Sequence, residues 1–217
     1  MSVTLPTLDL AGFSKNLDQA LGNKLPDEVV QRLWLHYEEL CQWSPRLSLV
    51  GSGTAGDVIA RHYAESLAAL PLLDPGRRVI DLGSGAGFPG MVLAAARPDL
   101  KVWLVEARHK KTVFLESAAR RAALSCSVLN VRVSASLPED FPDAVDILTI
   151  RALRLGPQEW SALTCRMDRN GRILRWAGPA APPPPEGFGI GRQVRIERSH
   201  RLVEELLRED RGTGIDV

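Results

Sequence analysis

The segment 77–90 constrains the fold of this chain more than any other. It reads Arg-Arg-Val-Ile-Asp-Leu-Gly-Ser-Gly-Ala-Gly-Phe-Pro-Gly. The aliphatic and β-branched residues at 79–82 predict a buried strand. Gly83, Gly85 and Gly87 follow at alternate positions, and glycine allows positive φ and a close approach of ligand to backbone. The apolar residues 91–96 then predict a helix with a proline near its first turn. Strand, glycine loop and helix in this order predict a cradle for a nucleotide-type cofactor.

The glycine spacing separates the cofactor classes. A dinucleotide fingerprint is Gly-x-Gly-x-x-Gly, and Phe88 stands at its third glycine position. A P-loop needs Gly-Lys-Ser/Thr after the loop, which this sequence lacks. The form Asp-x-Gly-x-Gly-x-Gly instead resembles the first motif of the S-adenosylmethionine (SAM) methyltransferases, whose cofactor carries no phosphate. The alternative is a glycine-rich turn that binds no ligand.

Composition sets the broad class. The 217 residues suggest one domain with an extension or two small domains, and 45% hydrophobic with 24% charged residues is ordinary for a soluble protein. The formal net charge of +1 gives no global signal for nucleic acid. The three cysteines are far apart, which argues against disulfides or a zinc site and for a reducing compartment. With no signal peptide or membrane-spanning stretch visible, we expect a cytoplasmic protein with neither metal nor membrane partner.

The order of the predicted elements indicates an α/β fold. Helical patterns cover much of residues 1–70, which we expect to form a helical extension packed on a core formed by residues 71–217. Strands and helices then alternate, as in a Rossmann-like sheet. The strands are predicted at 79–82, 102–105, 128–133, 144–150, 172–176 and 193–197, and the helices at 91–96, 110–123, 158–167 and 202–207.

Candidate site residues follow two of these strands. Glu106 ends the second strand, about 20 residues after the glycines, where Rossmann-type folds hold a ribose diol. The alternative for Glu106 is a solvent-exposed acid. Arg151 follows the fourth strand, at the edge where open α/β sheets bind ligands. The basic residues 108–111 begin a helix, where they are poorly placed for its dipole, so RNA contact and a solvated face are equally supported.

These residues together resemble the bacterial 16S rRNA guanine-N7 methyltransferases, once called glucose-inhibited division protein B. The resemblance runs from about residue 34 to about residue 178. It rests on Arg61-His62 with Ser66, the block 81–90, Arg97-Pro98, Lys110 with Phe114-Leu115, and Arg151-Ala152. It implies a class I methyltransferase sheet with an N-terminal helical cap, SAM as methyl donor, and N7 of one guanine in 16S rRNA of the small ribosomal subunit as acceptor.

The resemblance also implies site residues. By position, Gly83 and Phe88 would line the cofactor site, Ala135 and Ser136 would hold the adenine, and Arg151 would close the site. Together with Gly85 and Glu106 these are the predicted cofactor contacts. No catalytic side chain is predicted, because guanine N7 carries an available lone pair at neutral pH. Phosphate contacts are predicted at Arg108, Lys110, Lys111, Arg120 and Arg121, and the protein is expected to be a monomer.

The chain departs from the family pattern at three places. It has Arg46-Leu47-Ser48 where the family usually has Asn-Leu-Thr, Ser136 where an acid is usual, and Ala177-Gly178 where Lys-Gly is usual. Two other interpretations therefore stay open. One is a SAM-dependent enzyme of this fold with another RNA or a small molecule as substrate. The other is a SAM-binding module without turnover.

Overall fold

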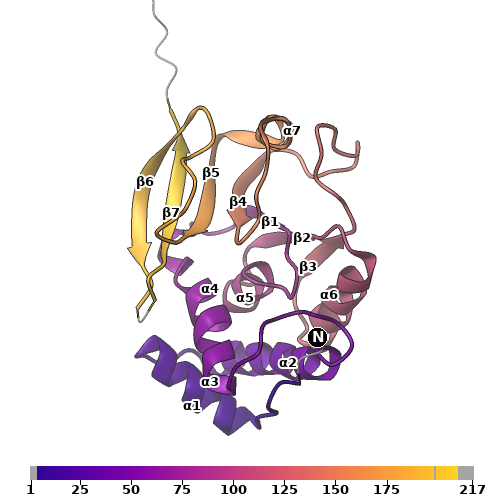
Figure 1. Cartoon of the computed structure of the whole chain (residues 1–217), viewed down its shortest axis with the longest axis vertical. Coiled ribbons are helices and arrows are strands. Elements are labelled where there is room, and N and C mark those ends of the chain that lie inside the picture. The colour runs from indigo at the N-terminus through magenta and orange to yellow at the C-terminus, as the bar shows by residue number, and fades with distance from the viewer. Residues whose placement is uncertain (1–3, 198, 210–217) are drawn as a thin grey trace, which may run out of the picture.

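A seven-stranded sheet is the centre of the computed structural model, which describes residues 4–197 and 199–209. Its strand order is β3-β2-β1-β4-β5-β7-β6, and within the described residues β1 to β5 pair in parallel while β7 pairs antiparallel with both β5 and β6 (Figure 1). The strands are β1 (Arg78–Leu82), β2 (Lys101–Val105), β3 (Cys126–Leu129), β4 (Val145–Ile150), β5 (Met167–Ala177), β6 (Phe188–Arg195) and β7 (Leu202–Arg208). The predicted α/β, Rossmann-like class is confirmed.

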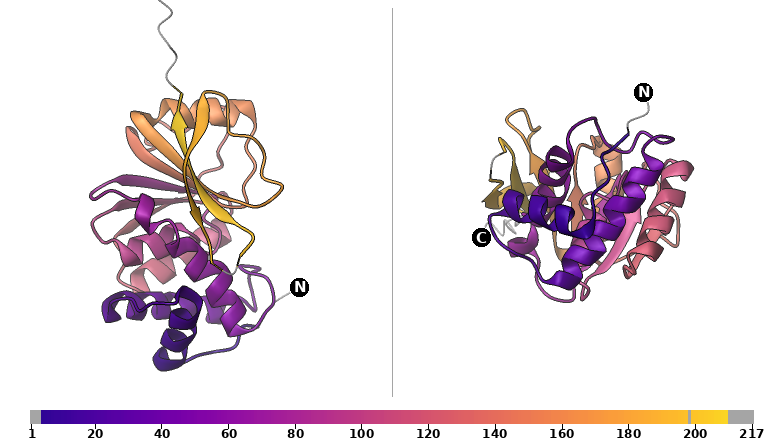
Figure 2. Two further views of the ribbon diagram at one scale, coloured as in Figure 1. Left: turned by 90° about the vertical axis from the view of Figure 1, so that its left-hand side faces the viewer. Right: turned by 90° about the horizontal axis from the view of Figure 1, so that it is seen from below.

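Helices of the first seventy residues lie below the sheet in Figure 1 and in the left-hand view of Figure 2. They are α1 (Leu10–Leu21), α2 (Asp27–Trp43), α3 (Ala55–Val58), the π-helical turn η1 (Ile59–Ala64) and α4 (Glu65–Leu67), followed by the 3₁₀ turn η2 (Leu70–Leu72). The connecting helices are α5 (Gly90–Ala96), α6 (His109–Arg121) and α7 (Pro157–Cys165). Among the described residues, no helix has the length and apolarity that a membrane crossing requires.

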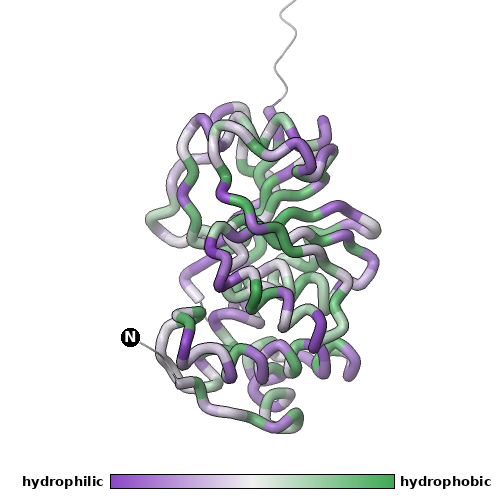
Figure 3. Tube along the Cα trace, turned by 90° about the vertical axis from the view of Figure 1, so that its right-hand side faces the viewer, coloured by the Kyte–Doolittle hydropathy of each residue, from purple (hydrophilic) through white to green (hydrophobic). Residues whose placement is uncertain are grey.

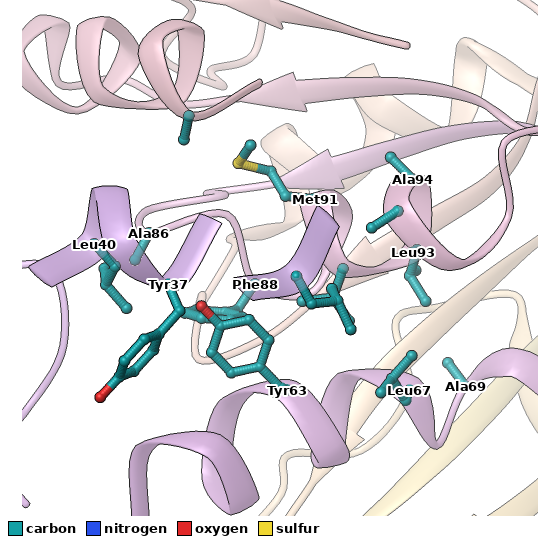
Figure 4. Packing of buried hydrophobic residues seen from close by; sticks show 14 of the residues in the cluster. Tyr37, Leu40, Tyr63, Leu67, Ala69, Ala86, Phe88, Met91, Leu93 and Ala94 are labelled. Atoms are coloured by element: carbon teal, nitrogen blue, oxygen red, sulfur yellow. The ribbon is translucent and has the colours of Figure 1, made fainter. Parts of the chain in front are cut away.

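One apolar core joins the helical extension to the sheet. Phe13, Tyr37 and Tyr63 of the extension are fully buried and belong to the same cluster as Val79 of β1 and Leu104 of β2. Figure 4 shows Tyr37 and Tyr63 lying beside Phe88, next to the helix that carries Met91. The extension therefore contributes to the core that supports the glycine loop. A division of the chain at residue 70 stays a prediction.

A second apolar cluster covers the other face of the sheet. It contains Ile80, Leu148 and Ile173 from three neighbouring strands, with Leu163 of α7. Because both faces of β1 and β4 are covered, these two strands are apolar along most of their length. Figure 3 shows hydrophobic segments gathered in the middle of the molecule.

The prediction of a helix at 202–207 is wrong, because this segment is β7. Glu204 and Glu205 are 7% and 1% exposed, although acids in such a pattern suggest a solvated helix face. Glu204 pairs with Arg175 at 2.5 Å, and Glu205 pairs with Arg172 at 2.8 Å. Both arginines lie on the neighbouring β5, and their ion pairs allow Glu204 and Glu205 to be buried. Because both of these residues are acidic, the sequence here lacks the alternation of apolar and polar residues that is typical of a strand.

Two other boundaries differ from the prediction. The third strand ends at Leu129 rather than at residue 133. β5 begins at Met167, so it includes the turn predicted at 168–171, and its pairing with β4 shifts register between Val145 and Ile147. Such an irregularity leaves residues of one strand unpaired, which explains the turn-like composition at this point.

Candidate active site

The glycine loop leaves β1 as a bend of left-handed residues. Gly83, Gly85 and Gly87 have φ of +68°, +57° and +87°. A Cβ on Gly87 would lie 2.6 Å from the sulfur of Met91, so this position also lacks room for a side chain. The backbone N–H of Gly83 donates to the carbonyl of Val105 over 2.8 Å, which joins the bend to the end of β2. The predicted strand, glycine loop and helix are confirmed.

Asp81 fixes the base of this bend. Its carboxylate is fully buried and accepts hydrogen bonds from the Thr149 hydroxyl (2.8 Å) and from the Gly90 N–H (3.1 Å). Burial raises the pKa of Asp81 to about 6, and the hydrogen bonds to Thr149, Ser84 and Gly90 oppose that shift. Asp81 therefore links β1, β4 and the start of α5, a role that its place in the sequence motif did not reveal.

Glu106 lies against the glycine bend. Its carboxylate accepts hydrogen bonds from the N–H of Gly85 (3.0 Å) and from the N–H of Arg108 (2.8 Å). The residue is 8% exposed, so the alternative of a solvent-exposed acid is wrong. Gly83, Gly85 and Glu106 are thus brought together at one edge of the sheet. Contact of Glu106 with a ribose stays a prediction.

His36 of α2 contacts the same loop from the helical extension. Its Nε2 lies 3.0 Å from the carbonyl oxygen of Ala86, and its Nδ1 lies 2.8 Å from the Tyr63 hydroxyl. A carbonyl only accepts, so Nε2 carries the proton and Nδ1 accepts from Tyr63. The residue is 1% exposed, and desolvation lowers the pKa of His36 to about 4, so the ring is neutral near pH 7. The sequence did not single out His36, because this residue lies among the apolar residues that form the buried face of α2.

We expect His36→Leu to loosen the loop and weaken cofactor binding. The substitution leaves the Tyr63 hydroxyl and the Ala86 carbonyl buried without this partner, at about 1–3 kcal/mol for each group. Urea unfolding and SAM titration measure the two effects. Tyr63→Phe is the matched control, because it removes the hydroxyl and keeps the His36–Ala86 bond. Equal losses of SAM affinity in both variants would contradict a role of His36 in holding the loop.

Arg151 is directed toward the helical extension. Its Nη2 lies 2.9 Å from the Glu65 carboxylate and also donates to the carbonyl of Arg61. The two side chains of the ion pair are 8% and 7% exposed. Nη1 of Arg151 is buried and has no hydrogen-bond partner among the described residues. Glu65 therefore supplies the counter-ion of Arg151.

Phe88, Ala135 and Ser136 are the remaining predicted cofactor contacts. Phe88 is 8% exposed, and its ring stacks on His62 at a centroid distance of 4.9 Å and meets His36 edge-on at 5.3 Å. Its ring therefore packs against the extension, and a cofactor contact stays a prediction. Ala135 and Ser136 are exposed in the segment between β3 and β4. For them, too, contact with an adenine stays a prediction.

A cleft of about 680 Å³ lies at the carboxyl ends of β4 and β5. It lies between the residues after β4, the Trp160 side of α7 and the proline run 182–185. Leu153 lines this cleft, and its side chain comes within 3.4 Å of the position that a Cβ on Gly83 would take. Leu153 therefore lies between this cleft and Gly83 of the bend.

Comparison with known proteins assigns the chain to a family. The family model described as GidB, rRNA small subunit methyltransferase G, matches residues 30–180. The chain belongs to this family. Relatives named Ribosomal RNA small subunit methyltransferase G include one from Methylobacterium radiotolerans, 38% identical over 188 residues, which covers 83% of this chain and 82% of that protein.

Other GidB relatives match over shorter segments. The proteins of the same name from Desulfotalea psychrophila and Paramagnetospirillum magneticum are 39% and 41% identical over 126 and 128 residues. These matches cover 58% of this chain in both cases, and 56% and 60% of the relatives, so the chain spans little more than half the length of these two proteins.

Solved structures agree on the fold. Magnesium protoporphyrin IX methyltransferase of Synechocystis PCC 6803, with bound SAM, superposes with a TM-score of 0.56 at 19% identity, over 85% of this chain and 98% of that one. A SAM-dependent methyltransferase of Aquifex aeolicus gives 0.53 at 17% identity, over 68% and 90%. At these identities the likeness concerns the fold alone, which is that of class I methyltransferases.

Proposed function

We propose that this GidB-family protein transfers a methyl group from SAM to N7 of a guanine in 16S rRNA. The observation that carries the proposal is the Glu106 carboxylate, held against the Gly83–Gly87 bend by the N–H of Gly85 at 3.0 Å. An acid at this place suits the two hydroxyls of an adenosine ribose. The names of the relatives, Ribosomal RNA small subunit methyltransferase G, supply the substrate class.

The residues present fit SAM. Each carboxylate oxygen has two acceptor sites, and each oxygen of Glu106 accepts one backbone N–H, so acceptor capacity is left for two hydroxyls. Gly83 is exposed, and a Cβ on Gly85 would meet the carbonyl of Gly83 at 3.6 Å and Nζ of Lys111 at 3.8 Å. Side chains at these two positions would fill the space in which a ligand approaches the backbone. SAM supplies an electrophilic methyl group on a sulfonium.

The protein's own part in this reaction is positioning. Guanine N7 has an available lone pair, so no side chain needs to remove a proton, and orientation of two reactants can contribute several kcal/mol. The methylated base gains positive charge, which an arginine against the ring would oppose. Glu65 holds the Arg151 guanidinium on the side of the helical extension. This placement favours an anion-holding role for Arg151 over contact with the base.

The remaining contacts are predicted from the resemblance and from charge. Phe88, Ala135, Ser136 and Arg151 stay predicted cofactor contacts. Of the predicted phosphate contacts, Lys110 lines a groove of about 410 Å³ together with Trp43, and Arg121 is held by Glu38 at 2.7 Å. An aromatic ring beside cations suits single-stranded RNA. A monomer in the cytoplasm, where ribosomes work, is part of the proposal.

A transfer assay tests the proposal. The protein is incubated with methyl-labelled SAM and with 16S rRNA or small subunits that lack the modification, and the digested nucleosides are separated. We expect label in N7-methylguanosine from one position. Tight SAM binding without transfer to either substrate would favour the binding module instead. Label in another RNA or in a small molecule would favour the enzyme with a different acceptor.

A further inference from the structure

A basic pocket of about 480 Å³ lies beside the candidate cofactor site. It is formed by the η1 turn, the end of β4 and the turn between β6 and β7. The residues that give it its chemistry are Arg61, His62, Glu65, Arg151, Ser199 and Arg201. Neither the glycine bend 83–87 nor Glu106 lines it. The pocket thus lies at the end of β4, the strand next to β1, and Arg151 is the one predicted cofactor contact among its described lining residues.

The pocket has more positive than negative charge. Glu65 is the one carboxylate among its described lining residues, and it faces Arg151 at 2.9 Å and Arg201 at 3.6 Å. Arg61 donates to backbone carbonyls, those of Ser52 and Asp57, both at 3.3 Å. The one buried carboxylate thus pairs with two of the three guanidinium groups. The lining as a whole keeps a net positive charge, which attracts an anion.

His62, which also lines the pocket, is acted on by the same positive charges. Burial, followed by Arg151, Arg61 and Arg201, lowers the pKa of His62 to about 3. The ring of His62 is therefore neutral near pH 7 and stacks on Phe88. A field that opposes a further positive charge at this place favours a negative group.

Arg151, which lines the pocket, has an unused hydrogen-bond donor. Its Nη1 is buried without a partner among the described residues, which is unfavourable for an N–H group. Glu65 engages Nη2 of the same guanidinium, which fixes its orientation. A further oxyanion would supply the acceptor that Nη1 lacks. Arg201, whose side chain is 47% exposed, lies at the rim.

We propose that this pocket binds a backbone phosphate of the substrate RNA. The inference rests on the proposed function and names how that substrate is held. Arg151 supplies the buried donor, while Arg61 and Arg201 are exposed cations that a polymer can reach from solvent. The rival anion is the carboxylate of SAM, which the prediction of Arg151 as a cofactor contact would place here. The phosphate is favoured because the residues of the glycine bend do not line the pocket and because its rim is open.

Arg201→Gln tests the proposal with little risk to folding. RNA affinity is measured for a 16S rRNA fragment at several KCl concentrations, and SAM affinity is measured by calorimetry. We expect weaker RNA binding and a salt slope that is smaller by about 0.7–0.9, the value for one phosphate contact. SAM affinity is expected to stay unchanged. Arg61→Gln, which removes the other rim cation, should act in the same direction.

Arg169→Gln is the matched control. Arg169 is also exposed, but it lies near the start of β5, at the opposite edge of the sheet from the pocket. Its loss removes the same charge and should leave the salt slope unchanged. A slope reduced equally by Arg169→Gln would overturn the proposal, because net charge alone would then explain the effect.

The outcomes separate the two anions and the two proposals. Lower SAM affinity in Arg201→Gln with an unchanged RNA slope would assign the pocket to the cofactor carboxylate and overturn the phosphate proposal. So would unchanged binding of both ligands. A smaller RNA slope in a protein whose wild type transfers no methyl group would support the phosphate pocket while the proposed reaction fails.

Discussion

Glu106→Ala is expected to lower the affinity for SAM by about 100-fold or more. A hydrogen bond to a charged group is worth about 1.5–3 kcal/mol, and the proposal assigns two ribose hydroxyls to this carboxylate. Since about 1.4 kcal/mol corresponds to a factor of ten, their loss predicts at least this decrease. The substitution also removes the acceptor of the Gly85 and Arg108 N–H groups, so the bend loses its support. Calorimetric titration with SAM measures the effect.

Two further variants serve as comparisons for this result. Glu106→Gln keeps one acceptor oxygen and should bind SAM with an intermediate affinity. Glu116→Ala removes an exposed acid from α6 and should bind as the wild type does. Wild-type affinity in Glu106→Ala would mean that this carboxylate supports the loop without holding a ligand.

Glu65→Ala is expected to destabilise the fold by about 3–5 kcal/mol. Removing one partner of a buried ion pair leaves the other charge uncompensated, and Arg151 is only 8% exposed. Ser199 also loses an acceptor, since its hydroxyl lies 3.1 Å from the Glu65 carboxylate. For a chain of this length each kcal/mol lowers the melting temperature by about 2–4 °C. Thermal and urea unfolding measure the loss.

The control is a partly exposed ion pair between α2 of the extension and α6. Glu38 pairs with Arg121 at 2.7 Å, with side chains 30% and 37% exposed, so Glu38→Ala should cost about 1 kcal/mol or less. The double variant Glu65→Ala/Arg151→Met removes both buried charges and should recover part of the stability. A loss below about 1 kcal/mol in Glu65→Ala would show that water or a rearranged side chain compensates Arg151.

The features that could be predicted from sequence are local ones. The strand before Gly83, the alternate glycines and the helix after Pro89 are specified by residues next to one another, and all three are confirmed. Glu106 could be located because the spacing from a glycine loop to the end of the next strand is nearly fixed in such folds. Its burial against Gly85 follows from that spacing.

What the sequence did not reveal depends on distant partners. His36 bonds Ala86, fifty residues later, and Arg151 pairs with Glu65, which precedes it by 86 residues. No local sequence pattern connects these residues. The sequence therefore indicated neither that His36 contacts the glycine loop nor that Arg151 points toward the helical extension. The strand β7 was missed for the same reason, because the arginines that bury Glu205 lie elsewhere in the sheet.

The aromatic cluster shows how far a resemblance can be carried. The motif places Phe88 in the loop, while the structure packs its ring on His62 and His36. The backbone of the loop thus contacts Glu106, while the ring of Phe88 packs against the helical extension. The sequence motif therefore specifies the position of Phe88 in the loop, while the packing of distant residues sets the direction of its ring.

The most direct measurement is a crystal structure of the protein grown with SAM. The proposal predicts an adenosyl group over the Gly83–Gly87 bend, with both ribose hydroxyls within hydrogen-bond distance of the Glu106 carboxylate. SAM bound elsewhere, or a bend that stays empty at saturating SAM with Glu106 bonded only to Gly85 and Arg108, would contradict it.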